Sequence, residues 1–266
     1  MMNGIVNILS SAGRKIIGAL DFAGFTIFLF FETLYYSKNV FSKRKEIIQH
    51  MYNAGVRTIL VISVVAMFTG MILTLQGGIE LEEFHMHDRI GNLVIASLTR
   101  EMGPFMTAII LIAAVGSAMA AEIGTMKVSE EIDALEIMSI SPVKYLVMPR
   151  VVALSIMLPI ATIYSNVLGT IGGSFVAESH FNISFESFYL HVLESLHFKA
   201  VYVGLLKSYV FGICISCTSC AHGLRASHGA MGVGKATRDS VVASFLIVLI
   251  IGYYITEIFF REGLRV

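Results

Sequence analysis

Long apolar stretches recur along the chain and predict helices that cross a membrane. Five of them stand out, and four of these are free of charged residues: Thr58 to Leu75, Gly103 to Ala121, Val151 to Ala177, Ala200 to Leu224 with Lys207 inside it, and Ser240 to Thr256. A helix rises about 1.5 Å per residue, so about 20 apolar residues cross a hydrocarbon core of roughly 30 Å. The pattern therefore predicts an all-α integral membrane protein with five transmembrane helices.

The residues before the first span have a different pattern. Residues 1 to 20 alternate apolar and basic positions in a way that suits a helix on the membrane surface. Asp21 is expected to interrupt it, and the run from Phe22 to Phe31 is too short to cross, which favours an in-plane or partly inserted helix. We expect one membrane domain over 1–266, with interfacial helices and a basic segment in 1–57 and the five-span bundle in 58–266.

A short amphipathic helix is predicted between spans two and three, over residues 128 to 138. Its apolar face carries Val128, Ile132, Leu135 and Met138, and its other faces carry Glu130, Glu131, Asp133 and Glu136. It is too short to span and too charged to enter lipid, so it lies outside the bilayer. Two interpretations stay open: the apolar face packs on the protein's own loops or on headgroups, or it docks a soluble partner.

Composition excludes several classes of protein. The chain is 56% hydrophobic and only 14% charged, with a formal net charge of zero, which is untypical of a soluble domain and gives no basic patch for nucleic acid. Cys214, Cys217 and Cys220 lie among small residues, so helix packing explains them better than an iron–sulfur cluster. The sequence from Gly229 to Lys235 resembles a phosphate-binding loop, but Ala236 replaces the required Ser or Thr.

Basic residues predict the orientation. With a cytoplasmic N-terminus, the cytoplasmic segments 1–57, 123–150 and 225–239 hold seven, three and three Lys or Arg residues. The external segments would hold five: Arg89, Arg100, Lys199, Arg261 and Arg265. The positive-inside rule therefore favours a cytoplasmic N-terminus and places the 128–138 helix in the cytoplasm.

Charged residues at or inside the spans are candidates for function. Gly91 to Thr99 is expected to form a half-helix that returns into the second span, with a break at Arg100 and Glu101. These two could form a local ion pair. Lys207 could extend to the interface, or pair with a carboxylate or a lipid phosphate. His85 and His87 lie among carboxylates, but they lack a second fixed ligand pair, so no metal site is predicted.

Four motifs resemble those of a known family. REMGP at 100–104, GSAMAAEIGTM at 116–126, EIDALEIM at 131–138 and SPVKYLVMPR at 141–150 are similar to the signature of the MlaE family. These proteins are permease subunits of ABC transporters that move phospholipids or other lipids between bacterial membranes with MCE-domain proteins. The resemblance implies a chain in the inner membrane that forms a homodimer.

The resemblance also implies partners and site residues. It implies a cytoplasmic ABC ATPase that holds the ATP and Mg, a periplasmic MCE-domain protein and a phospholipid substrate, with no cofactor on this chain and no enzymatic activity of its own. The lipid cavity is expected to involve Glu101, Arg100, Leu73, Gln76, Leu81 and Phe84, although Glu80 departs from the apolar character expected nearby. The cytoplasmic coupling helix is expected to contact the ATPase through Val128, Glu131, Ile132, Leu135 and Met138.

Two other classes of function stay open on the sequence alone. One is an intramembrane enzyme, built from Ser117 with His222 or from His85 and His87, although Ser117 lacks the sequence context of rhomboid-type proteases. The other is a membrane anchor that holds an ATPase complex without transporting anything.

Overall fold

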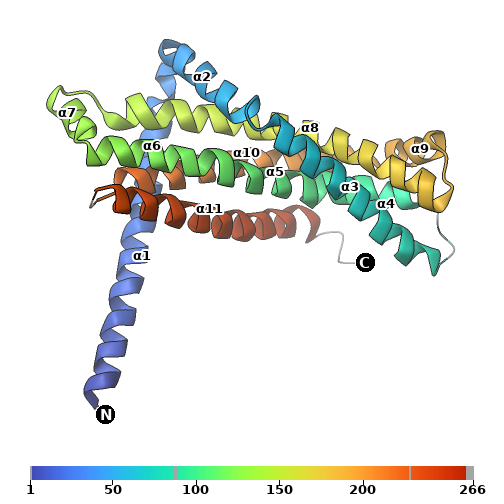
Figure 1. Ribbon diagram of the computed structural model, residues 1–266, viewed down its shortest axis with the longest axis horizontal. Coiled ribbons are helices and arrows are strands. Elements are labelled where there is room, and N and C mark those ends of the chain that lie inside the picture. The colour runs from blue at the N-terminus through green and yellow to red at the C-terminus, as the bar shows by residue number, and fades with distance from the viewer. Residues whose placement is uncertain (1, 85, 87–88, 228, 262–266) are drawn as a thin grey trace.

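The computed structural model describes residues 2–84, 86, 89–227 and 229–261, and these fold into helices joined by short turns (Figure 1). Five helical segments in this part of the chain are long and apolar enough to cross a membrane: Ile59–Glu82, Ile90–Val128, Val143–Phe181, Phe198–Leu224 and Gly229–Phe260. Each of them overlaps one predicted span and extends it. The predicted all-α fold with five spans is confirmed.

The N-terminal region is α1 (Met2–Tyr36), a 3₁₀ helix (Ser37–Lys43) and α2 (Arg44–Gly55). Figure 1 shows α1 crossing one end of the bundle at a steep angle to the spans, as an in-plane helix would. The predicted interruption at Asp21 is wrong, because α1 is continuous through it. The Asp21 carboxylate accepts a hydrogen bond from Arg225 at 2.7 Å, so its charge has a partner and the helix does not need to end.

The second span is built from several helical segments. It contains α4 (Ile90–Ser97), a π-helical turn (Leu98–Met102), α5 (Gly103–Leu111), a second π-helical turn (Ile112–Gly116) and α6 (Ser117–Val128). These segments form one continuous helical stretch, Ile90–Val128, so the predicted half-helix is wrong, and in place of the predicted break at Arg100 and Glu101 there is a π-helical turn that does not end the helix. Proline in a helix clashes with the carbonyl four residues earlier, and a widened π turn before Pro104 relieves that clash without ending the helix.

The third span begins with a π-helical turn (Val143–Val147) and continues as α8 (Met148–Phe181). It packs closely on the first span, α3 (Ile59–Glu82). A Cβ atom on Gly70 would lie 1.8 Å from the carbonyl oxygen of Gly169, so only glycine allows this approach. Such contacts explain why α8 is the most buried of the five spans.

The two ends of the bundle differ. At one end, α7 (Glu131–Ile137) joins α6 to the third span, and at the other end α9 (Phe185–Ser195) joins α8 to α10 (Phe198–Leu224) (Figure 1). The last helix, α11 (Gly229–Phe260), includes the stretch that resembles a phosphate-binding loop, so this stretch is a helix and not a loop. Cys217 and Cys220 are buried among apolar side chains, as packing residues would be.

Candidate functional site

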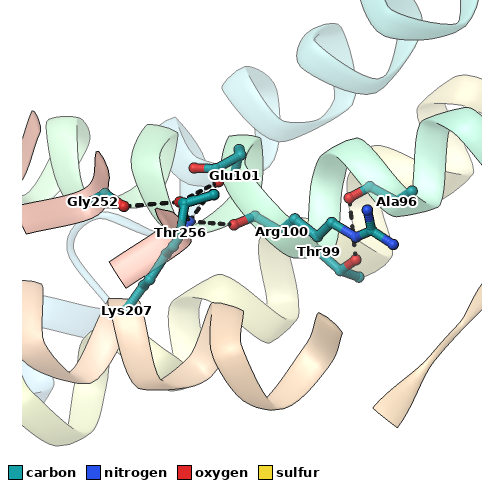
Figure 2. A network of polar contacts seen from close by, with 7 residues as sticks. All are labelled: Ala96, Thr99, Arg100, Glu101, Lys207, Gly252 and Thr256. Carbon is teal, nitrogen blue, oxygen red and sulfur yellow. Dashed lines mark hydrogen bonds and ion pairs between the residues drawn. The ribbon is translucent and has the colours of Figure 1, made fainter. Parts of the chain in front are cut away.

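Lys207 is the most completely buried charged side chain of the described residues, with 1% of it exposed. It lies on α10 and faces the second and fifth spans. Its Nζ donates to the Glu101 Oε1 at 2.6 Å, to the Thr256 Oγ1 at 2.6 Å and to the Arg100 carbonyl at 2.9 Å (Figure 2). An ammonium group has three donors, so each of them has a partner.

The local sequence explains why the Arg100 carbonyl is free to accept. Pro104 has no N–H, so it cannot donate to the carbonyl four residues before it, which is that of Arg100. The Lys207 ammonium fills this gap from another helix. A buried backbone carbonyl without a partner is costly, so the proline and the lysine compensate for each other.

Thr256 connects the last span to the same cluster. Its hydroxyl lies 2.6 Å from the Glu101 Oε1 and 2.9 Å from the Gly252 carbonyl, and it accepts from Lys207. A hydroxyl has one proton, so Thr256 donates to one of these two oxygens at a time. The second, fourth and fifth spans thus meet at one ion pair.

The cluster answers two questions that the sequence left open. Lys207 does not extend to the interface, because it pairs with the Glu101 carboxylate. The local ion pair of Arg100 with Glu101 does not form among the described residues. Figure 2 shows the Arg100 guanidinium on the side away from the cluster, and it lies 5.1 Å from the centre of the Phe260 ring.

A cavity of about 360 Å³ borders the cluster. Its lining is largely apolar and comes from α5, α10 and α11: Phe105, Phe211, Val248, Leu249 and Tyr253, with Met102 and Gly252. Glu101 and Lys207 also line it, and the Glu101 side chain is 46% exposed while the Lys207 side chain is 1% exposed. The site therefore presents one carboxylate at the edge of an apolar cavity, which suits an amphiphile with a hydrogen-bond donor in its headgroup.

The predicted wall residues on α3 do not line this cavity within one chain. Leu73 and Leu81 pack in part against the core formed by α4 and α9, Gln76 is exposed, and Phe84 is 67% exposed just after α3. Their role in a lipid site stays a prediction. Sequence reasoning missed Phe105, Phe211, Tyr253 and Thr256, and only Thr256, a hydroxyl at the edge of an apolar run, gave a signal.

A second buried cation lies toward the α7 end of the bundle. Arg150, with 8% of its side chain exposed, donates to the Glu122 Oε2 at 3.0 Å and to the Leu146 carbonyl at 2.8 Å. His50 of α2 is nearby, and its pKa is lowered by burial first and by the Arg150 charge second. The cluster fixes α6 against the start of α8 on either side of α7.

The predicted coupling residues fall into two groups. Ile132 is buried, and Leu135 packs in part against the same core cluster, so this part of the apolar face covers the protein itself. Glu131 is exposed, Val128 at the end of α6 is partly exposed, and Met138 is 60% exposed. Ile137 is 85% exposed beside it. Contact of these residues with an ATPase stays a prediction.

The residues of the enzyme hypothesis do not form a catalytic pair. The Ser117 hydroxyl donates to the Ala113 carbonyl of its own helix. The His222 ring packs on Phe22, with the ring centres 4.1 Å apart. No hydrogen bond joins Ser117 to His222 among the described residues. His85 and His87 lie outside the described residues.

A larger cavity of about 720 Å³ lies elsewhere, between α8 and α9. Its lining is apolar apart from a few groups such as Asn166, Thr170 and Glu186, and it holds no buried ion pair. We therefore place the candidate site at Glu101, where a charge, a cavity and an irregular helix coincide.

Several known transporter permeases are similar in sequence to this chain. Residues 47–258 match the family model described as permease MlaE. A probable ABC transporter permease protein of Rickettsia typhi is 38% identical over 215 residues, which cover 81% of this chain and 83% of the relative. One from Synechocystis is 37% identical over 218 residues, covering 82% and 83%.

A further relative covers almost the whole chain. The intermembrane phospholipid transport system permease protein MlaE of Haemophilus influenzae is 30% identical over 260 residues, which cover 97% of this chain and all of the relative. The matched region of the family model contains the Lys207 cluster, the Arg150 cluster and α7. This chain is a multi-pass membrane protein that belongs to the MlaE family of ABC transporter permeases.

Proposed function

We propose that the protein moves phospholipids or related lipids between the inner membrane and the outer envelope of a bacterium. The observation that carries the proposal is the Glu101 carboxylate at the edge of an apolar cavity inside the membrane. By insertion scales a charge costs about 2.5–3.5 kcal/mol at the bilayer centre and less toward its edge, so ionisable residues within membrane spans usually serve a function. The printed function of the Haemophilus influenzae relative, intermembrane phospholipid transport, supports the same substrate class.

The energy comes from a separate subunit in this proposal. A cytoplasmic ABC ATPase holds ATP and Mg and docks at the α7 end, where Ile137 and Met138 are exposed. The basic residues near this end favour a cytoplasmic position for it and for the N-terminus. Two copies of the chain form the transport unit, and a periplasmic MCE-domain protein exchanges lipid with it at the α9 end.

The transport proposal is tested by reconstitution. The chain is placed in liposomes with the ATPase from the same gene cluster, and the transfer of a labelled phospholipid to an acceptor is measured with and without ATP. We expect transfer to require ATP and to stop with Glu101→Gln. Transfer by the chain alone would contradict the proposal, and ATPase binding without any transfer would favour the anchor interpretation.

The docking proposal needs a separate test. Ile137→Asp puts a carboxylate on the exposed tip, and we expect it to reduce co-purification of the ATPase by about tenfold or more, as loss of an interface anchor does. Leu190→Asp is the matched control, because Leu190 is 60% exposed on α9 at the opposite end. If the Ile137→Asp variant co-purified with the ATPase at the wild-type yield, α7 would not be the docking element.

A further inference from the structure

A groove opens between α2, the start of α3 and the middle of α8. Its volume is about 450 Å³, and almost all of its lining is apolar. Ile48 and Tyr52 line it from α2, Val56 lines it just after α2, and Met157 and Ile160 line it from α8. The Ile48 side chain is 62% exposed, so the chain itself does not cover this apolar surface.

The groove offers little that could bind a polar group. Tyr52 and Tyr164 carry its side-chain hydroxyls. The Tyr164 hydroxyl lies 2.8 Å from the Ser63 Oγ, which donates its own proton to the Ile59 carbonyl. Tyr164 therefore donates to Ser63, and its proton has a partner within the protein. Such a lining suits a hydrocarbon chain better than a polar ligand.

One end of the groove begins at the basic segment that precedes the first span. α2 starts with Arg44 and Lys45, four and three positions before Ile48, so both lie on the helix face that lines the groove. Both side chains are exposed. Phe41, just before them, is 88% exposed. An exposed aromatic side chain beside basic ones is typical of a segment at the level of lipid headgroups.

Nearby carboxylates do not neutralise the start of α2. Lys43 pairs with Glu46 at 3.0 Å, and its Nζ lies 4.0 Å from the centre of the Tyr145 ring. No ion pair among the described residues includes Arg44 or Lys45. Two unpaired positive charges thus stand at the mouth of an apolar groove, which is complementary to a molecule with an anionic head and a hydrocarbon chain.

The groove has the reach of one bilayer leaflet. From Ile48 to Ile62 it follows about 20 Å of helix at about 1.5 Å per residue, and one leaflet of a roughly 30 Å hydrocarbon core is about 15 Å thick. Figure 1 shows α2 toward the α7 end of the bundle. In the proposed orientation this end is cytoplasmic, and the cytoplasmic leaflet is the one that carries anionic lipids.

We propose that the groove holds an anionic phospholipid of the cytoplasmic leaflet, with one acyl chain between α2 and α8 and the headgroup on Arg44 and Lys45. The site is separate from the Glu101 cavity, which α5, α10 and α11 line. It goes beyond the proposed transport, because the bound lipid is not cargo. The lipid covers the open apolar surface and so stabilises the contact of the N-terminal helices with the third span.

The headgroup contact is tested by counting bound lipids. Full-length protein in detergent is titrated with dioleoyl phosphatidylglycerol or with zwitterionic dioleoyl phosphatidylcholine, and bound lipid is counted by native mass spectrometry. We expect the wild type to bind one more phosphatidylglycerol than phosphatidylcholine per chain. A basic residue near an anionic surface contributes roughly fivefold in affinity, so Arg44→Gln with Lys45→Gln is expected to weaken this extra site by about 25-fold.

The matched control for the charges is Lys235→Gln with Arg238→Gln, which removes two exposed basic residues on α11. We expect this variant to keep the extra phosphatidylglycerol. An unchanged preference for phosphatidylglycerol in the Arg44 and Lys45 variant would overturn the headgroup contact.

The chain contact has its own pair of variants. Ile160→Trp fills the groove with an apolar ring at a position that is 49% exposed, and we expect it to abolish the extra site. Val167→Trp is the matched control, since Val167 is 54% exposed two turns further along α8 and lines the larger cavity instead. Equal binding by these two variants would overturn the groove as the acyl-chain site.

A photocrosslink identifies the occupant in native membranes. Tyr52 is 54% exposed, and p-benzoylphenylalanine in its place is expected to crosslink to lipid. A crosslink to a membrane span of another protein, with no lipid adduct, would overturn the lipid as the occupant. None of these measurements reads out transfer, so the site can fail while ATP-driven transfer stands. A wild type that binds the extra lipid and transfers none would leave the site and refute the transport proposal.

Discussion

The Lys207 and Arg150 clusters are built alike but extend differently through the fold. In each cluster, a buried cation pairs with a partly exposed glutamate. The same cation donates to a backbone carbonyl in a π-helical turn. Each of these turns ends two residues before a proline. Lys207 reaches residues on the second and fifth spans, 49 or more positions away. Arg150 reaches its own helix and one residue 28 positions away.

This difference indicates different roles. Lys207 joins three spans at the wall of a cavity, so a change in that cavity must disturb its contacts. Arg150 fixes the two helices that flank α7, so it stabilises the geometry of one end of the bundle. A buried cation thus supports the candidate substrate site in one place and the candidate ATPase site in the other.

The largest effect is expected from Glu101→Gln. Removal of one partner of a buried ion pair costs about 3–5 kcal/mol, and we expect about 3 kcal/mol because Glu101 is half exposed. The measurement is chemical denaturation of the purified protein in detergent. The double variant Glu101→Leu with Lys207→Met removes both charges, and it should recover part of the lost stability. A double variant less stable than Glu101→Gln would show that the ion pair is not the cause.

A smaller loss is expected from Thr256→Val. The substitution keeps the shape and removes the hydroxyl, so one donor of the buried ammonium loses its acceptor, at a cost of about 2 kcal/mol. Thr237→Val on the same helix is the matched control, since its hydroxyl donates only to the Val233 carbonyl of its own helix. Equal losses in the two variants, measured by the same denaturation, would rule out a special role for Thr256.

Glu122→Gln is expected to cost about 1 kcal/mol, less than either change at the Lys207 cluster. Glu122 is 57% exposed, and Arg150 keeps the Leu146 carbonyl as an acceptor. Denaturation of this variant beside Glu101→Gln measures the difference between the two clusters directly. A loss of stability as large as that of Glu101→Gln would mean that the two ion pairs contribute equally to the stability of the fold.

The smallest effect is the pH dependence that His50 adds to the Arg150 region. Burial and the Arg150 charge lower its pKa, so the unfolded state binds a proton at a higher pH than the folded state. This contribution to stability is present above the ordinary pKa of about 6.5 and is lost as pH falls below it. We expect the wild type to lose more stability between pH 7 and pH 5 than His50→Gln. The same pH dependence of stability in the wild type and in His50→Gln would show that His50 makes no contribution to it.

The spans were predictable from the sequence because a long apolar run has few other uses, and all five were found. Two interruptions were predicted wrongly, at Asp21 and at Arg100 with Glu101, because partners from distant helices offset the cost of these charges. The sequence marked Glu101 and Lys207 separately as charges at or inside the spans. It could not show that they pair, since 106 positions separate them.

The apolar cavity was harder to predict than its carboxylate. Phe211 and Tyr253 resemble any other lipid-facing aromatic in a span, and only the packing of α10 against α11 turns them toward Glu101. The predicted helix over 128–138 is shorter in the structure, where α7 is Glu131–Ile137 and Val128 lies at the end of α6, and Ile132 of the predicted face covers the protein's own core. Periodicity identifies such a face without identifying what it packs against.

The most direct test of the central claim is a density map of the permease with its ATPase and native lipid. We predict acyl-chain density in the cavity lined by Phe105, Phe211 and Tyr253, with a headgroup within hydrogen-bonding distance of Glu101. A cavity without lipid beside Glu101, with lipid bound instead in the larger cavity between α8 and α9, would contradict the account.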